Sequence, residues 1–486
     1  MLKILKYFYA ITAVMLLSPG LVIGQSSSYP DILFISIDDL NDWVGPLGGH
    51  PQAQTPNMDR LAERGITFTN ARSPAVICNP SRTAMMTGLL PSTTGLYMNQ
   101  PDWRSLEQYQ EIRTIPSYFR DAGYHTVGAG KLFHSSTYNT PAYYGFNDTT
   151  AWDLYYPSLE RQLPDEIRPH DRPANGNPFS ELFDWGTVTA DDRATGDGQV
   201  IAWSADRIKE SNTSPRFNAV GIYRPHLPWY LPKEYFDLYP LDKVELPPFL
   251  EEDLDDLPDY ATRPLERSGI YMPAMEIHDW FIDTGLWKEG VQAYLASISF
   301  ADAMLGRILD ALEQSGRQQN TIIILWSDHG FHLGEKHRWR KHTLWNESTR
   351  VPLIIVAPEI ALPGSSSNAT VSLMDIYPTL TELAGLNTPT HIQGSSLVPI
   401  LRNPSLESNR SVITTHGYSN HAVTQGRYRY IKYSDGSEEL YDIETDPNEW
   451  FNRASDPQFL EIKESLILEL PEYNAPDARG GDSPGN

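Results

Sequence analysis

Residues 31–39 read DILFISIDD, an apolar run that ends in two consecutive aspartates. Apart from Ser36, every residue between Asp31 and Asp38 is apolar, and isoleucine dominates the run. A run that is apolar on both faces, rather than at alternate positions, is typical of a strand covered on both sides in a parallel sheet. The stretch therefore predicts a buried strand that delivers Asp38 and Asp39 at its carboxyl end.

Four more apolar runs repeat this pattern along the chain. They are HTVGAGKLFH at 125–134, NAVGIYRPHLPW at 218–229, TIIILWSDHG at 321–330 and VPLIIVAP at 351–358. Segments of helical periodicity separate them, and the longest, 291–316, has one apolar face formed by Tyr294, Ile298, Ala301, Leu305, Ile308 and Leu312. Strands that alternate with helices predict an α/β fold, with a large, mostly parallel sheet of these buried strands flanked by helices.

The character of the sequence changes near residue 403. Short alternating segments follow, with Asp-Gly and Asp-Pro turns, as in HAVTQGRYRYIKYSDGSEELYDIETDPNEWFN. We therefore expect a large domain over 25–403 and a smaller C-terminal subdomain with an antiparallel sheet over 404–475. The last stretch, 476–486, reads PDARGGDSPGN, a composition typical of a disordered tail.

The first residues have the pattern of a secretory signal. Lys3 and Lys6 precede an apolar run, and small residues then lead to Gly24. This predicts a signal peptide over 1–24 and export to the periplasm or the medium, with a membrane anchor as the alternative. No second long apolar run follows, so we expect the mature protein not to be a membrane protein.

Charge and cysteine content restrict the function further. The 486 residues contain 38 Lys and Arg against 62 Asp and Glu, a formal net charge of −24. So acidic a protein repels nucleic acid and anionic membranes, and we exclude both as partners. Cys78 is the only cysteine. It cannot form a disulfide within the chain, so it is either an inert buried thiol or a residue with a chemical role.

Polar residues gather where the predicted strands end. Asp38 and Asp39 end the first strand, Lys131 and His134 follow the second, His226 follows the third, and Asp328 and His329 end the fourth. Ligands of such sheets bind at the carboxyl edge of the strands. Carboxylates are hard oxygen ligands that suit Ca²⁺ or Mg²⁺. Taken singly, each aspartate could instead cap a loop or a helix.

Cys78 stands in SPAVICNPSRTAMMTG, residues 73–88, at the start of a predicted helix. Arg82 lies one turn further along this helix, and the N–H groups of a helix N-terminus attract anions. Together with Lys131 and Lys341, these groups suit the binding of a tetrahedral anion, as sulfuryl or phosphoryl transfer requires.

The segment CNPSRTAMMTG resembles the signature of the formylglycine-dependent sulfatases. SIDDLNDWVG, TPNMDRLAERGITFTNA, VGAGKLFH, YRPHLPW, SDHGFHLGE and RWRKHTLWNESTRVPLI also resemble this family and appear in the expected order. The resemblance is strongest to the branch that contains iduronate-2-sulfatase and bacterial polysaccharide sulfatases, including ulvan-type enzymes. It implies an alkaline-phosphatase-like fold and conversion of Cys78 to formylglycine (3-oxoalanine) by a formylglycine-generating enzyme.

The same resemblance assigns roles at the site. The metal ligands would be Asp38, Asp39, Asp328 and His329, with the formylglycine oxygen at position 78 completing the set around Ca²⁺, or Mg²⁺. Most sulfatases have asparagine where this chain has His329, which leaves the identity of the metal less defined than its presence. The catalytic residues would be Cys78 as nucleophile, Arg82 holding the formylglycine, Lys131 and Lys341 binding sulfate, and His134 and His226 transferring protons.

The implied function is hydrolysis of a sulfate ester on a sulfated oligosaccharide or polysaccharide. We expect exo-action on uronate- or rhamnose-containing chains such as ulvan or glycosaminoglycan fragments. The expected substrate-binding residues are Trp103, Arg104, Arg224, Lys336 and His337. The alternatives are a phosphodiesterase or phosphonate hydrolase of the same superfamily, or a non-catalytic glycan-binding protein if Cys78 stays unmodified.

Overall fold

The computed structural model describes residues 29–479, apart from gaps at 136–144, 159, 164–166, 180–182, 212–213, 264, 268–269 and 273. The predicted signal peptide and the end of the predicted tail, 480–486, lie outside the described residues. Within the described part, the helices are too short or too polar to cross a bilayer.

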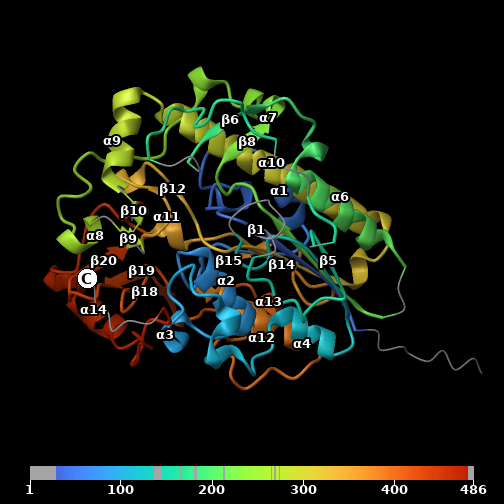
Figure 1. The fold of residues 1–486 in the computed structure, drawn as a ribbon. Helices are drawn as coiled ribbons and strands as arrows, with labels where there is room; N and C mark the ends of the chain where they lie inside the picture. Colours follow the sequence, from blue (N-terminus) through green and yellow to red (C-terminus); the bar gives the residue numbers. More distant parts are fainter. Residues whose placement is uncertain are drawn as a thin grey trace, which may run out of the picture.

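The centre of the molecule is an eight-stranded sheet (Figure 1). In spatial order its strands are β15 (Ser365–Ser367), β2 (Ile66–Phe68), β14 (Leu353–Val356), β11 (Thr321–Ser327), β1 (Asp31–Ile37), β7 (Arg216–Ile222), β4 (His125–Gly130) and β5 (Leu154–Tyr156). β1 pairs in parallel with β11 on one side and β7 on the other, and β7, β4 and β5 continue in parallel. The predicted α/β fold with a mostly parallel sheet is confirmed.

One strand direction was predicted wrongly. We expected 351–358 to form a parallel strand, but β14 runs antiparallel to both β11 and β2. A parallel neighbour needs a crossover that carries the chain back across the sheet. Between β11 and β14 the chain forms the hairpin of β12 (His332–Leu333) and β13 (Trp339–Arg340), with one 3-10 turn at Glu335–His337 inside it, and the short α11 (Asn346–Thr349). The chain therefore re-enters the sheet from the edge at which it left.

Alternate residues of the central strands feed two hydrophobic cores. Leu33 and Ile35 of β1 pack into one core, and Ile32 and Phe34 into the other. The first core takes in α1 (Pro56–Ala62), α6 (Gly196–Lys209) and α10 (Trp287–Gln314). The second takes in α2 (Cys78–Thr87), α4 (Ile115–Asp121), α12 (Ile376–Leu383) and α13 (Val398–Arg402). Figure 1 shows these two groups of helices on opposite sides of the sheet.

The predicted long helix is confirmed as α10. All six residues of its predicted apolar face are buried: Tyr294, Ile298, Ala301, Leu305, Ile308 and Leu312. Burial of this face against the sheet and α6 explains why so long a segment stays helical, because packing outweighs propensity in proteins.

The C-terminal part forms the expected antiparallel sheet. Its strands follow one another as β17 (Ser411–Thr415), β18 (His421–Gln425), β19 (Tyr428–Lys432) and β20 (Glu438–Asp442), and α14 (Leu460–Ile467) covers them. The domain boundary near residue 403 stays a prediction. Of the predicted tail, residues 476–479 are described, and the Ala478 N–H donates to the Gly95 carbonyl oxygen at 2.9 Å.

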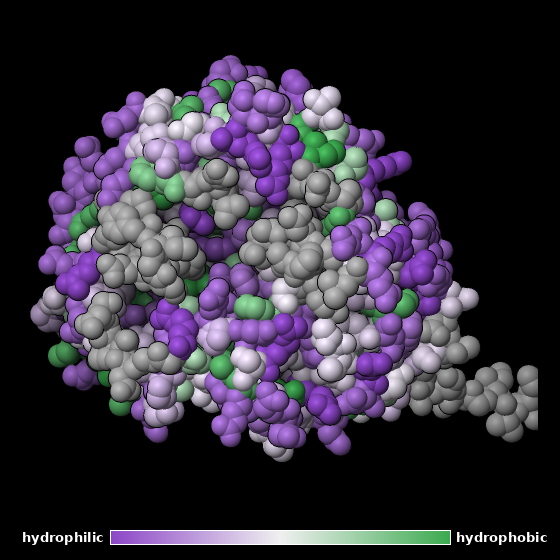
Figure 2. All heavy atoms as spheres, viewed as in Figure 1, coloured by the Kyte–Doolittle hydropathy of each residue, from purple (hydrophilic) through white to green (hydrophobic). Residues whose placement is uncertain are grey.

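Smaller elements complete the fold. Two-stranded sheets pair β3 (Ala71–Arg72) with β16 (Val371–Ser372), β6 (Trp185–Val188) with β8 (Trp229–Pro232), and β9 (Leu265–Arg267) with β10 (Ile270–Met272). The remaining helices of the described residues are α3 (Pro91–Thr94), α7 (Lys233–Asp237), α8 (Asp259–Thr262) and α9 (Ala274–Thr284). On the face shown in Figure 2, hydrophilic residues dominate and hydrophobic residues occur in small separate groups.

Candidate active site

The carboxyl ends of three parallel strands converge on the first residue of α2. Asp38 follows β1, Lys131 follows β4, Asp328 follows β11, and Cys78 begins α2. All four residues are buried. The convergence arises because β4, β7, β1 and β11 are parallel, so that their carboxyl ends lie on one edge of the sheet.

Arg82 connects these strand ends. Its Nε donates to Asp328 Oδ2 and one terminal nitrogen donates to Asp38 Oδ1, both at 2.8 Å. The other terminal nitrogen donates to the carbonyl oxygens of Lys131 and Leu132, at 2.8 and 3.0 Å. The guanidinium is completely buried, so these acceptors compensate its charge. Arg82, in the first turns of α2, thus holds the carboxylates of Asp38 and Asp328 at a fixed separation.

Two lysines bring positive charge to the same place. Lys131 Nζ donates to Asp38 Oδ2, and Lys341 Nζ donates to Asp39 Oδ1 at 2.5 Å. Burial alone would raise the pKa of Asp38, but Lys131 and Arg82 hold this pKa well below its usual value. Burial alone would lower the pKa of Lys131 and of Lys341, yet the facing aspartates raise both. Both lysines are therefore cations throughout the physiological pH range.

Cys78 lies among these charges. Its Sγ is 3.1 Å from Lys341 Nζ and 3.3 Å from His329 Nε2. Burial would raise the pKa of the thiol, but Lys341, Lys131 and His329 hold it well below its usual value. These contacts argue against the interpretation of Cys78 as an inert apolar thiol, because structural buried cysteines lie in apolar surroundings.

Two further histidines border position 78. The side chain of His134 hydrogen-bonds to Cys78, and burial lowers the pKa of His134, which favours a neutral imidazole. His226 Nε2 lies 4.0 Å from Asp39 Oδ2, and its Nδ1 lies 2.7 Å from the Leu227 carbonyl oxygen. A neutral His134 can accept a proton, and His226 is partly exposed, so it can exchange protons with a ligand.

The donor atoms suit a divalent cation. One oxygen, nitrogen or sulfur atom from each of Asp39, Cys78, Asp328 and His329 lies within 4.8 Å of the others, and Asp38, Asp39 and His226 form a second such group. Burial raises the pKa of Asp328 to about 6, although Arg82 opposes this rise. Crowded, buried carboxylates favour a bound cation that offsets their repulsion. The residues present therefore fit the predicted metal.

The structure brings together all ten predicted metal-binding and catalytic residues: Asp38, Asp39, Cys78, Arg82, Lys131, His134, His226, Asp328, His329 and Lys341. Most of them were chosen from strand ends or from motif order, and they come from five segments that lie far apart in the sequence, at 38–39, 78–82, 131–134, 226 and 328–341. Their roles in turnover stay predictions.

The predicted substrate-binding residues do not all lie next to this group. Trp103 is a core residue that stacks on Phe133 and donates its Nε1–H to the Phe146 carbonyl oxygen. Arg104 is partly exposed and forms a bidentate pair with Asp102.

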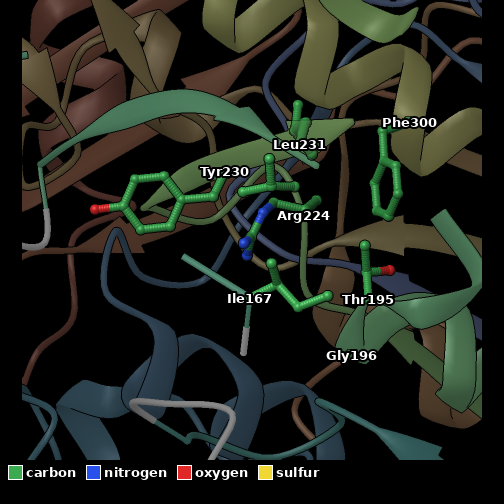
Figure 3. A pocket seen from close by; sticks show the side chains of 8 residues that line it. Ile167, Thr195, Gly196, Arg224, Tyr230, Leu231 and Phe300 are labelled. Carbon is green, nitrogen blue, oxygen red and sulfur yellow. The ribbon is translucent and has the colours of Figure 1, made fainter. Parts of the chain in front are cut away.

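Arg224 lies behind His226. Its NH1 is 3.4 Å from the His226 carbonyl oxygen, and its guanidinium lies over the Tyr223 ring. Figure 3 shows the Arg224 side chain in a small pocket beside Ile167, Tyr230 and Leu231. The structure thus places Arg224 next to the site and Trp103 in the hydrophobic core.

Lys336 and His337 have partners outside the group of residues around position 78. Lys336 Nζ is buried and donates to Asp253 Oδ1 at 2.8 Å and to the Glu449 carbonyl oxygen. The His337 ring packs against Phe249. Sequence reasoning instead missed Arg340, which immediately precedes Lys341. The run RWRK signals a basic cluster, but it does not show which of its cations faces the site.

Comparison with known protein families shows to which family the chain belongs. Residues 30–386 match the Sulfatase family, and residues 334–475 match the family described as N-sulphoglucosamine sulphohydrolase, C-terminal. The chain belongs to the sulfatase family. It is therefore a sulfuric ester hydrolase, which argues against a glycan-binding protein without activity.

Several curated relatives of this sulfatase are similar over most of its length. A "Sulfatase" of Formosa agariphila is 41% identical over 452 residues, covering 92% of this chain and 87% of that protein. Human iduronate 2-sulfatase is 31% identical over 402 residues, covering 75% and 71%. The ulvan-active sulfatase of Formosa agariphila is 27% identical over 457 residues, covering 91% and 80%.

Solved structures confirm the fold of this sulfatase. The phosphonate monoester hydrolase SpPMH from Silicibacter pomeroyi aligns with a TM-score of 0.71 and 20% identity, covering 90% of this chain and 94% of that one. BT4656, solved with its substrate D-glucosamine-2-N,6-O-disulfate, aligns with a TM-score of 0.67 and 20% identity, covering 91% and 97%.

Proposed function

We propose that this sulfatase hydrolyses a sulfate ester on a carbohydrate through a formylglycine made from Cys78. The observation that carries the proposal is the position of Cys78, at the start of α2, with Lys341 Nζ 3.1 Å and His329 Nε2 3.3 Å from its Sγ. A side chain at this position faces cations on one side and carboxylates on the other, so it can meet both a sulfate and a metal ion.

The chemistry balances with formylglycine in its hydrated form, which carries two hydroxyl groups. One hydroxyl oxygen, as it loses its proton, bonds to the sulfur of the ester, and the bond from sulfur to the sugar oxygen breaks. The other hydroxyl then loses its proton, the carbonyl reforms, and the bond between carbon and the sulfated oxygen breaks to release sulfate. Water adds to the aldehyde and restores the hydrate. Serine and cysteine lack the second hydroxyl that this release requires.

The surrounding residues can carry out each proton transfer and offset the negative charge of the sulfate oxygens. Lys131 and Lys341 supply positive charge for the sulfate oxygens. His134, beside position 78, is placed to take the proton of the second hydroxyl, and His226 is placed to protonate the departing sugar oxygen. Arg82 keeps the two strand-end aspartates at a fixed distance.

Asp38, Asp39, Asp328 and His329 would hold a divalent metal, for which we propose Ca²⁺, with Mg²⁺ as the second choice. When bound, the metal would act as a Lewis acid that lowers the negative charge at the sulfate and at position 78. The carboxylates would meanwhile keep the ion in place.

The substrate class rests on the relatives. Names such as iduronate 2-sulfatase and ulvan-active sulfatase, and a fold neighbour solved with a sulfated glucosamine, favour a sulfated sugar with a uronate or rhamnose unit. We propose exo-action at the end of such a chain. The predicted signal peptide over 1–24 makes this an exported enzyme that meets polysaccharide outside the cytoplasm, after maturation by a formylglycine-generating enzyme.

Peptide mass spectrometry of the protein from its native host tests the nucleophile. The peptide that spans residues 73–82 should carry formylglycine at position 78. Unmodified cysteine in fully active protein would overturn the proposal.

A substrate panel tests the reaction. We expect turnover of an aryl sulfate and of defined ulvan or glycosaminoglycan oligosaccharides to exceed turnover of an aryl phosphodiester or phosphonate monoester. A preference for the phosphorus esters would support the phosphonate-hydrolase alternative instead.

A further inference from the structure

Arg340 is a cation next to the active site that the proposed mechanism does not use. It ends β13, pairs with His332 of β12, and is followed directly by Lys341, whose amine contacts Cys78. Its guanidinium lies 6.0 Å from the centre of the Phe183 ring. The charges of Asp39 and position 78 act on it through space. Arg340 therefore lies close enough to the site to interact electrostatically with its residues.

The Arg340 side chain has no acceptor among the described residues. Its Nε is buried without a hydrogen bond, although the side chain as a whole is partly exposed. Burial lowers the pKa of Arg340, and Asp39 and Cys78 offset this only in part. A partly desolvated guanidinium without a carboxylate partner is unfavourable unless an anion binds to it.

Two neighbouring cations of the same loop each donate at least one hydrogen bond. Lys336 donates to Asp253 and to a backbone carbonyl. Arg338 is buried, donates to the Ala261 carbonyl oxygen at 3.0 Å, and lies over the Trp345 ring. Arg338 Nε is also buried without a hydrogen bond, so the difference is that the Arg340 guanidinium donates no hydrogen bond at all to the described residues, whereas Lys336 and Arg338 each donate at least one.

The backbone of Arg340 adds a second observation. Its φ is 74°, in the left-handed region that residues with a Cβ adopt at a cost of about 1–3 kcal/mol. Lys336, His337 and His342 of the same loop also have positive φ. Strain of this kind persists where the surrounding structure imposes it, and it is enriched at ligand-binding sites.

We propose that Arg340 binds a second anionic group of the sugar, next to the sulfate that is removed. The group is a carboxylate or a second sulfate, because a planar guanidinium binds paired oxygens of either through two parallel hydrogen bonds. This inference rests on the proposed function, since it needs a sulfated carbohydrate in the site. Arg340 then determines substrate choice and takes no part in bond breaking.

The test compares kcat/KM for matched sugar pairs. One pair is a sulfated uronate oligosaccharide and its carboxyl-reduced form, and the other is a disulfated unit and its monosulfated form. For the pair that carries the recognised anion, the ratio of kcat/KM should fall about tenfold to a hundredfold in Arg340→Met. Arg340→Lys should retain part of the ratio. The pair that responds identifies whether the anion is a carboxylate or a sulfate.

Arg338→Met is the matched control, because it removes a guanidinium of the same loop that does not face the site. Its ratios should equal those of the parent. Unchanged ratios in Arg340→Met for both pairs, or an equal fall in Arg338→Met, would overturn the proposal.

Binding of the same sugars to Cys78→Ala and to Cys78→Ala/Arg340→Met, measured by calorimetry, separates the two proposals. Loss of affinity for the anionic sugar in the double variant supports the role of Arg340 even if the parent turns over no sulfate ester. Equal affinities in the two variants would overturn it.

Discussion

The side-chain amine of Lys341 lies 3.1 Å from the sulfur of Cys78 and 2.5 Å from Asp39 Oδ1. The first two residues are 263 positions apart in the chain, and both are buried. The protein carries a net charge of −24, yet its reacting position faces a fixed cation. Local positive charge in an acidic protein favours the binding of an anion at this place, while the negative charge of the rest of the protein disfavours it elsewhere.

Replacement of Cys78 by alanine should abolish turnover and preserve the fold. The nucleophile is lost, so kcat should fall by about ten-thousand-fold or more. Only one sulfur atom is removed, so the melting temperature should change by a few degrees. Steady-state kinetics on an aryl sulfate and a thermal unfolding curve measure the two effects. Full activity in this variant would mean that the nucleophile lies elsewhere.

Removal of divalent metal should abolish activity reversibly. Chelation leaves the crowded carboxylates of Asp39 and Asp328 with only Lys341 and Arg82 to offset their charge, and the sulfate loses a source of positive charge. Activity should return on addition of Ca²⁺ or Mg²⁺, and metal analysis should find about one ion per chain in the active protein. An enzyme that is indifferent to chelator would contradict the metal assignment.

Glu449→Gln should destabilise the contact between the C-terminal sheet and the loop before β14. Glu449 pairs with Arg429, and its Oε2 accepts the Asn346 N–H at 2.8 Å; both charged side chains are completely buried. Loss of one member of a buried pair costs about 3–5 kcal/mol, because the other charge stays desolvated. Urea unfolding measures this change.

Asp310→Asn serves as the control for that measurement. Asp310 pairs with Arg60 at 2.9 Å, but both side chains are largely accessible to solvent. An exposed pair contributes about 0–1 kcal/mol. Equal losses of unfolding free energy in Glu449→Gln and Asp310→Asn would contradict the interpretation of the buried network.

We expect the Glu438 carboxylate to make the unfolding free energy depend on pH in the acidic range. Burial raises its pKa, but Lys432, Tyr430 and Lys463 outweigh this and lower the pKa from 4.5 to about 2. Because the folded pKa is below the unfolded one, the stabilisation is complete above pH 4.5 and is lost as the pH falls towards 2. Glu438→Gln should cost on the order of 1 kcal/mol at pH 7, since its lysine partners are partly exposed.

Unfolding curves in urea, an uncharged denaturant that does not screen the ion pairs, at several pH values check this expectation. The difference in unfolding free energy between the parent and Glu438→Gln should shrink between pH 4.5 and about 2. A difference that stays constant across this range would show that the Glu438 carboxylate gains nothing from its cationic partners.

Much of the sheet could be predicted from local patterns. The runs at 31–39 and 321–330 are apolar on both faces, and they form the paired central strands β1 and β11. The direction of β14 could not be predicted in this way. A strand has the same composition whether it runs parallel or antiparallel, and only the path of residues 328–352 decides the direction.

The residues of the site also divide into those that the sequence could predict and those that it could not. Asp38, Lys131 and Asp328 were predicted because each follows a buried strand at its carboxyl end. Lys336 and Arg340 lie four residues apart in one basic run, yet the first pairs with Asp253 and the second interacts electrostatically with Asp39 and Cys78. Their positive φ values make the loop irregular, so no periodicity in the sequence indicates which side chain points inward.

The sequence by itself determined that this is an α/β protein, which residues end its strands, and that Cys78 begins a helix in a sulfatase signature. The tertiary structure alone decided which cations of the 334–342 segment reach the site and which are neutralised by buried carboxylates. The reason is physical: hydrophobic patterning acts over neighbouring residues. The pairing of a buried charge, in contrast, depends on groups that the fold brings from hundreds of residues away.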